Sequence, residues 1–166
     1  MRYVPPMSGD IRFALVIDAP APLVWEVVSD LPRYEEWNPF VVRAVSSLAV
    51  GDPIAMRVKV LPFLVQPQRE TILEHEPGTR VCWGVPGRAG SPIRSRRCQE
   101  VRAEGDTRTH YVSDFALQGW LAPLVMTLLG RRLHAGFQAM SQAVKERAEL
   151  LQRQRGAARR ETHSGT

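Results

Sequence analysis

Two hydroxyl-bearing residues fall where polar groups are least expected in this sequence. Residues alternate along 106–117, so that Tyr111 and Ser113 share the apolar face with Phe115. A hydroxyl in an apolar interior needs a hydrogen-bonding partner. We therefore expect Tyr111 and Ser113 to bond each other, water or a ligand. Both are therefore candidate ligand-binding residues.

Arg97 belongs to the densest basic cluster outside the C-terminal tail, together with Arg94 and Arg96. Alternation along 93–103 places Arg97 on the face opposite to the other two. Which face is interior depends on whether the turn at 104–106 contains two or three residues. If Arg97 points inward, it must meet a carboxylate or an anionic or carbonyl-bearing ligand, because an unpaired buried guanidinium is costly. If it points outward, the cluster is a charged rim.

The other predicted ligand-contacting residues are apolar and lie on the expected inward faces of strands and helices: Trp37, Phe40, Met56, Val58, Trp83, Phe115, Phe137 and Met140. Trp37 and Phe40 flank the end of a short helix, where they either seal a cavity or cap the core. An apolar face of a strand or helix forms part of the hydrophobic core more often than part of a ligand site. The pattern therefore leaves open whether these residues contact a ligand. No nucleophile, base and orienting group can be assembled from spacing, and we assign no catalytic residue.

Hydrophobic periodicity predicts the elements that position these residues. Alternation over 10–18 indicates a strand, and apolar steps of three and four after Pro22 indicate a short helix that ends near Asp30. A second brief helix begins at Leu31. From Phe40 onward the period is two, interrupted by turn signals. Six further strands are expected near 40–47, 53–60, 66–76, 79–85, 93–103 and 106–117, each antiparallel to the next.

Beyond Gly119 the apolar residues recur at helical spacing and predict one long amphipathic helix. Gly130 and Gly136 within it either allow close approach to the sheet or mark a bend. We expect the helix to fray near 155–156. The domain prediction is a flexible N-terminus at 1–9, one domain at 10–152 and a basic disordered tail at 153–166.

Composition sets the broad class. The 166 residues are 44% hydrophobic and 23% charged, typical of one folded domain. The net charge of +5 is due in large part to tail arginines, and no nucleic-acid-reading motif is present. The apolar stretch 120–130 is too short to span a bilayer. Cys82 and Cys98 lie on adjacent predicted strands and could be cross-strand neighbours, but reduced thiols are the default expectation in a cytoplasmic protein. We expect no cofactor and no metal, and the oligomeric state stays open.

A strongly curled seven-stranded sheet leaves more space than one helix can fill. The order of elements and three stretches of sequence also resemble the START and birch-pollen-allergen superfamily (SRPBCC), in its polyketide cyclase/dehydrase-like branch. These stretches are 17–30, the Tyr-Glu-Glu-Trp-Asn-Pro-Phe run at 34–40, and the strand and helix at 115–149. The resemblance implies an α+β helix-grip fold, with the sheet wrapped around the C-terminal helix and two short helices after strand one.

Three functional hypotheses follow. The first is a protein that binds a hydrophobic small molecule, such as a lipid, polyketide or isoprenoid, in a cavity between the sheet and the C-terminal helix. The second, by resemblance to aromatase/cyclases, is an enzyme whose polar pocket groups position a poly-β-keto chain and assist proton transfer during ring closure. The candidates for this role are Arg97, Tyr111 and Ser113. The third is a protein-interaction module that uses the terminal helix and basic tail.

Overall fold

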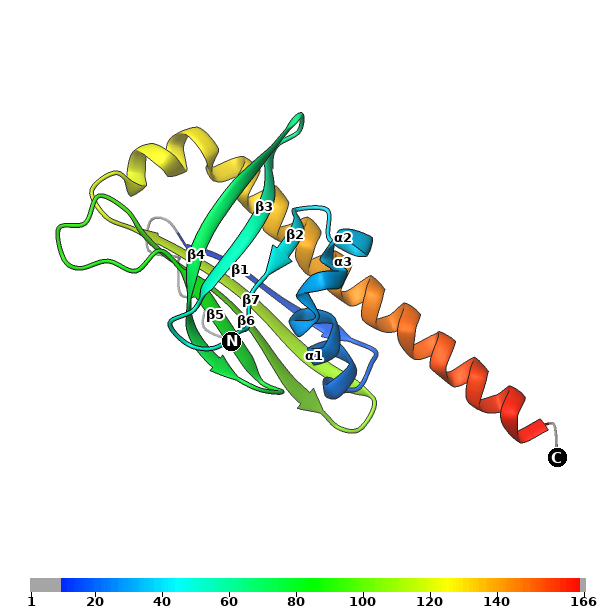
Figure 1. Cartoon of the computed structure of the whole chain (residues 1–166). Coiled ribbons are helices and arrows are strands. Elements are labelled where there is room, and N and C mark those ends of the chain that lie inside the picture. The colour runs from blue at the N-terminus through cyan, green and yellow to red at the C-terminus, as the bar shows by residue number, and fades with distance from the viewer. Residues whose placement is uncertain (1–9, 165–166) are drawn as a thin grey trace, which may run out of the picture.

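The computed structural model describes residues 10–164, which form one curved antiparallel sheet with a long helix across it (Figure 1). Seven strands lie in the order β1-β7-β6-β5-β4-β3-β2. Connections of two to nine residues join β2 through β7, and chain neighbours pair antiparallel. The predicted helix-grip fold is confirmed. The strands are β1 (Asp10–Ile17), β2 (Val41–Val45), β3 (Pro53–Leu61), β4 (Leu64–Glu76), β5 (Arg80–Gly84), β6 (Arg94–Glu104) and β7 (Arg108–Gln118).

The turn between β6 and β7 decides which side chains enter the interior. Glu104 pairs with Arg108, so three residues lie between the two strands. The same register sets Arg97 opposite Phe115, on the concave face. Since successive strand residues alternate between faces, Arg96 points outward. Of the two alternatives that the sequence left open, the structure selects the inward Arg97.

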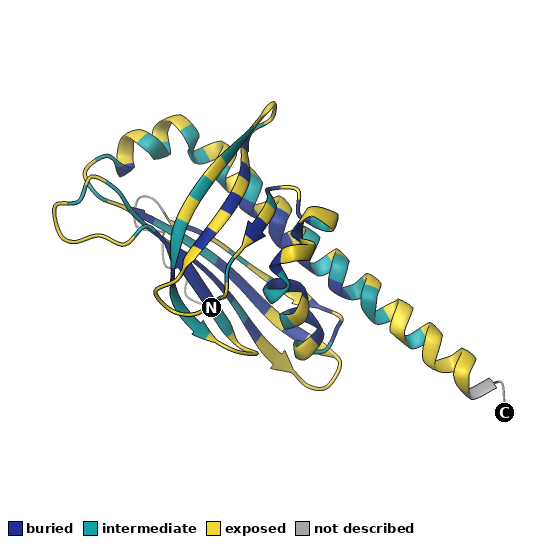
Figure 2. Ribbon diagram, viewed as in Figure 1, coloured by how far each residue is buried: buried dark blue, intermediate teal, exposed yellow. Residues whose placement is uncertain are grey.

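Three short helical segments follow β1 and close one end of the sheet: α1 (Ala21–Ser29), the 3₁₀ turn η1 (Leu31–Arg33) and α2 (Tyr34–Trp37). Proline suits the first turn of α1, where its missing N–H would have no partner within the helix. The buried face of α1 consists of Leu23, Val24, Val27 and Val28. These side chains belong to the main hydrophobic core. Figure 2 shows where buried residues lie along the ribbon.

The long helix α3 (Ala122–Ser164) bends after its first turns and then runs straight across the sheet (Figure 1). Its central part reaches the core through Met140, Val144 and Ala148, which are fully buried. At Gly136 the helix backbone lies against the ring of Phe40, and a Cβ added there would lie 2.3 Å from that ring. Gly136 therefore allows close approach, one of the two roles expected for it.

The C-terminal end of α3 differs from the prediction. The helix continues to Ser164, so the expected fraying near 155–156 is wrong. Arg155, at the predicted end, pairs with Glu26 of α1 at 2.7 Å, a long-range contact that the local sequence pattern does not show. The predicted flexible stretch at 1–9 lies outside the described residues.

The two cysteines also differ from the prediction. Cys82 and Cys98 are direct cross-strand partners on β5 and β6, and a disulfide joins them. The expectation of reduced thiols is wrong: residues that face each other in adjacent antiparallel strands have Cβ atoms close enough for the bond. In the part of the chain from 10 to 164, no helix combines the length and the apolar character needed to cross a membrane.

Candidate functional site

A cavity of about 220 Å³ lies between the concave face of the sheet and the first half of α3. Strands β3 to β7 form its wall, and Val125, Leu129, Leu133 and Phe137 of α3 cover it. Its lining is mainly apolar, with a few polar groups. Pockets that bind small molecules combine these two features, because apolar area supplies affinity and a few polar groups fix orientation.

Arg97 is the main polar group in the cavity wall. Its side chain is buried, at 3% exposure, yet no carboxylate among residues 10–164 forms an ion pair with it. Nη1 donates to Ser113 Oγ at 2.5 Å, and Nε has no hydrogen-bond partner. The guanidinium lies 4.4 Å from the centre of the Phe137 ring, a cation–π contact. Burial lowers the pKa of Arg97, and the nearby hydroxyls of Tyr111 and Tyr34 oppose that shift.

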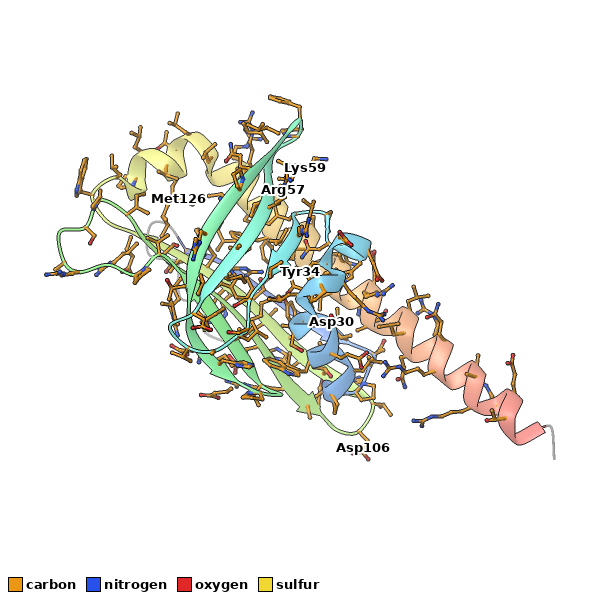
Figure 3. The ribbon with its side chains drawn as sticks, in the orientation of Figure 1. Asp30, Tyr34, Arg57, Lys59, Asp106 and Met126 are labelled. Atoms are coloured by element: carbon orange, nitrogen blue, oxygen red, sulfur yellow. A yellow bond between two sulfur atoms is a disulfide. The ribbon has the colours of Figure 1, made fainter. Side chains whose placement is uncertain are left out.

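A chain of hydrogen bonds runs behind Arg97 into the core. Tyr111 donates to Gln99 Oε1 at 2.7 Å, and Gln99 Nε2 lies 3.4 Å from the hydroxyl of Tyr34. Tyr34, labelled in Figure 3, donates in turn to the carbonyl oxygen of Val28 at 2.6 Å. Burial raises the pKa of both tyrosines, so both stay neutral donors. A satisfied buried network of this kind holds its members in fixed orientations.

Glu70 on β4 also lines the cavity. Burial raises the pKa of its carboxyl to about 7, and the positive charge of Arg97 opposes the shift without reversing it. A carboxyl group with a pKa near neutrality is protonated in part of the population at physiological pH. It can therefore accept or donate a proton, as general acid–base chemistry requires.

The structure places the eleven predicted ligand-contacting residues in three environments. Seven line the cavity: Phe40, Met56, Val58, Trp83, Arg97, Phe115 and Phe137. Three lie behind the wall as support for Arg97: Ser113, Tyr111 and Met140, whose Sδ is 3.7 Å from Arg97 Nη2. Trp37 is elsewhere, in a shallow depression between α1, α2 and α3, and packs edge-on against Tyr34 at 5.0 Å between ring centres.

Sequence analysis missed the polar residues that β4 contributes to the cavity, Glu70 among them. In the structure, alternation along β4 places Gln66, Gln68 and Glu70 on the same inward face as the buried Ile72. The sequence contains no clear signal for this face, because the neighbouring Leu73 is also apolar and lies on the other one. Because Gln66, Gln68 and Glu70 are polar, this face of β4 has the residue types of a solvent-exposed face. Gln99, which links the two tyrosines, follows by the same rule from Arg97.

Residues 10–149 match the family described as polyketide cyclase / dehydrase and lipid transport. The match covers most of the chain, which therefore belongs to this family. The search of curated proteins finds no match. Within residues 10–164, no group of three or more His, Cys, Asp or Glu side chains is arranged to hold a metal ion.

Solved structures show the same fold at low sequence identity. An aromatase/cyclase, ZhuI, from Streptomyces sp. R1128 has a TM-score of 0.64 and 18% identity over 84% of this chain and 93% of its own. A START superfamily protein from Mycobacterium smegmatis has a TM-score of 0.64 and 17% identity, over 86% and 99%. A protein from Nitrosomonas europaea has a TM-score of 0.65 and 15% identity, over 92% and 99%. The chain thus has the START/SRPBCC fold.

Proposed function

We propose that the protein binds a small molecule with an apolar body and a carboxylate or carbonyl end in the cavity between the sheet and α3. The polar end would meet Arg97, and the apolar body would lie along Val58, Trp83 and Leu133. The observation that carries this proposal is a buried guanidinium without a carboxylate partner in the wall of an apolar cavity. An anionic or carbonyl oxygen would supply the missing acceptor.

The position of Arg97 supports an oriented mode of binding. Ser113, the Phe137 ring and Met140 hold the guanidinium on three sides, so it cannot turn to reach solvent. Its unpaired Nε retains a proton to donate. Family membership, in a group described by cyclisation, dehydration and lipid transport, agrees with an apolar ligand.

Matched pairs of ligands test the proposal. Decanoate would be compared with decanol, and 2-naphthoate with 2-naphthalenemethanol, by isothermal titration calorimetry on the wild type and Arg97→Met. We expect the wild type to prefer each acid to its alcohol by about tenfold or more, since hydrogen bonds to charged groups contribute about 1.5–3 kcal/mol. Arg97→Met should remove this preference and still bind the alcohols. Arg102→Met, an exposed arginine near the far end of β6, is the control.

The proposal fails in two recognisable ways. Absence of binding by all four ligands would exclude the small apolar acids and alcohols as a class. Equal acid preference in the wild type and Arg97→Met would show that the polar end lies elsewhere.

Glu70 favours a second candidate function, a proton-transfer step in ring closure of a poly-β-keto chain. A carboxyl with a pKa of about 7 and a guanidinium face one cavity, and together they would remove a proton next to a carbonyl that Arg97 polarises. A synthetic poly-β-keto thioester tests this role, because such chains also cyclise without a catalyst. We expect the wild type to change the ratio of ring products and Glu70→Gln to restore the uncatalysed ratio. An exposed variant on α2, Glu35→Gln, should act as the wild type does.

A further inference from the structure

The first turns of α3 are apolar on two sides, although only one side faces the protein. Val125, Leu129 and Leu133 cover the cavity. Leu124 and Leu128 point away from it, and Leu128 is 67% exposed. A helix that is apolar on all sides is normally buried on all sides. The outer side of this segment therefore lacks an apolar covering in the isolated chain.

The one polar side chain between 122 and 129 does not relieve this exposure. Thr127 donates its hydroxyl proton to the carbonyl oxygen of Pro123 at 2.8 Å, so its polar group is turned to the helix backbone. Trp120, directly before the helix, is 69% exposed. Figure 2 shows this part of α3 as mainly exposed and intermediate, in contrast to the buried centre of the sheet.

A second apolar projection borders the same cavity. The hairpin between β3 and β4 contributes Val60 and Gln66 to the cavity wall, and at its tip Phe63 is 85% exposed. Leu64 beside it is also exposed. Figure 1 shows this hairpin reaching out from the sheet, beyond the bend of α3. We name the exposed residues on these two projections the mouth surface: Phe63, Leu64, Trp120, Leu124 and Leu128.

The segments that form the two projections carry charge of one sign. None of the 17 Asp and Glu residues falls within 53–69, 84–99 or 115–145, the segments from which the two projections and the loop between β5 and β6 are built. Basic residues do occur there, and Lys59, labelled in Figure 3, is two residues from the end of β3. Arg131 and Arg132 follow Leu128 on α3. None of these three has an ion-pair partner among residues 10–162, whose side chains are described.

We propose that the mouth surface docks on the surface of an anionic lipid bilayer, with its apolar side chains among the acyl chains and Lys59, Arg131 and Arg132 at the headgroups. Aromatic and leucine side chains next to basic residues are the pattern of interfacial membrane binding. Two separate projections suit a deformable bilayer better than a flat protein surface. A second copy of the chain is disfavoured, because two surfaces of the same positive charge would face each other.

Docking in this way places the parts of the cavity wall formed by the β3–β4 hairpin and the start of α3 next to the bilayer. If the proposed apolar ligand is correct, the ligand passes between membrane and cavity without crossing water. The docking itself does not depend on that ligand. It can therefore be tested with the protein and vesicles alone, so that its failure is distinct from a failure of the cavity proposal.

Vesicle co-sedimentation measures the proposed binding. Vesicles of phosphatidylcholine alone would be compared with vesicles of phosphatidylcholine and phosphatidylglycerol, at low and high salt. The wild type should bind the anionic vesicles, and salt should weaken the binding. Phe63→Ser with Leu128→Ser should reduce partitioning by about tenfold or more, since each removes a large apolar side chain from the bilayer. Val50→Ser, at a turn after β2 with 63% exposure, is the matched control.

Charge variants give an independent readout. Arg131→Gln with Arg132→Gln should weaken binding to anionic vesicles by about thirtyfold, because each basic residue near such a surface contributes about fivefold. The control pair, Arg102→Gln with Arg108→Gln, removes two charges near the turn at the opposite end of β6 and β7. It should bind as the wild type does, apart from any small effect of net charge.

The fluorescence of Trp120 reports how deeply this residue enters the bilayer. Lipids with brominated acyl chains should quench the tryptophan fluorescence of the wild type, and Trp120→Phe should lose most of that quenching. Three results overturn the proposal: no binding of the wild type to anionic vesicles, equal loss in the control and mouth-surface variants, or quenching that is unchanged in Trp120→Phe. A dimer in light scattering that Leu128→Ser dissociates, without vesicle binding, would assign the surface to a second copy instead.

Discussion

The ring of Phe40 occupies the place where a side chain at Gly136 would lie, 2.3 Å from an added Cβ. This contact sets how closely α3 crosses the sheet next to the cavity. Phe40 in turn packs edge-on against Phe137, with 5.0 Å between ring centres, and Phe137 contacts both Phe115 and Arg97. The approach of one helix backbone to one ring thus positions the guanidinium.

Substitution of Gly136 should therefore destabilise the protein. Gly136→Ala would force Phe40 or the helix to move, and we expect the free energy of unfolding to fall by about 1–3 kcal/mol. Gly156, also within α3, has no atom within 4 Å of an added Cβ. Gly156→Ala should instead gain up to about 1 kcal/mol from helix propensity. Urea denaturation of both variants checks the contrast, and equal effects at the two glycines would contradict it.

Removal of the buried charge should not cost stability in the unliganded protein. Arg97→Met keeps most of the side-chain volume and removes a guanidinium that lacks a carboxylate partner. Replacement of buried charges by apolar groups of similar size is often neutral or stabilising by about 1–4 kcal/mol. We expect Arg97→Met to match or exceed the wild type in urea denaturation without ligand. A loss of more than about 2 kcal/mol would show that Ser113 and the Phe137 ring already compensate the charge fully.

Glu70 should make stability depend on pH between its ordinary pKa of 4.5 and about 7. In this range the folded protein retains the proton that the unfolded chain has released. The free energy of unfolding is then highest below about pH 4.5 and falls as the pH rises to 7, by about 2–3 kcal/mol. Glu70→Gln removes this slope, so its advantage over the wild type should be present at pH 8 and absent near pH 4.5. Denaturant titrations at both pH values measure it, with Glu35→Gln as the surface control.

The disulfide should contribute measurably to stability. It joins residues that are 16 apart in the sequence. In the entropic treatment, a cross-link that closes a loop of this length lowers the entropy of the unfolded chain and so stabilises the folded protein by about 3 kcal/mol. Dithiothreitol should lower the denaturation midpoint of the wild type. Cys82→Ser with Cys98→Ser should start from the lowered midpoint and show no response to the reductant. A wild type that does not respond, with free thiols by titration, would show that the bond is not formed in solution.

The alternation of residues along the strands predicted many of the inward-facing side chains. It could do so because only one face of this sheet is covered by the core, so that every second residue of a strand is buried. It placed Tyr111 and Ser113 inward, where the structure has them. It could not orient Arg97, since that depended on the length of a single turn. It also passed over Glu70, whose strand lacks the apolar face that normally reveals an inward side.

Contacts between distant segments account for the remaining differences. The pair between Arg155 and Glu26 joins the C-terminal part of α3 to α1, and its two residues are far apart in the sequence. The bond between Cys82 and Cys98 depends on strand register as well as on residue type. Periodicity placed the two cysteines on adjacent strands, but it could not give their exact register, and the pair between Arg155 and Glu26 leaves no local pattern at all.

The three-residue connection between Glu104 and Arg108 also has an evolutionary consequence. Loss or gain of one residue there, without a compensating bulge, would exchange the two faces of β6. Arg97 would move to solvent and its neighbours on the strand would take its place. Relatives with one deletion in this loop would present different side chains of β6 to the cavity. We therefore expect them to bind chemically different ligands, even where the sequence of β6 is identical.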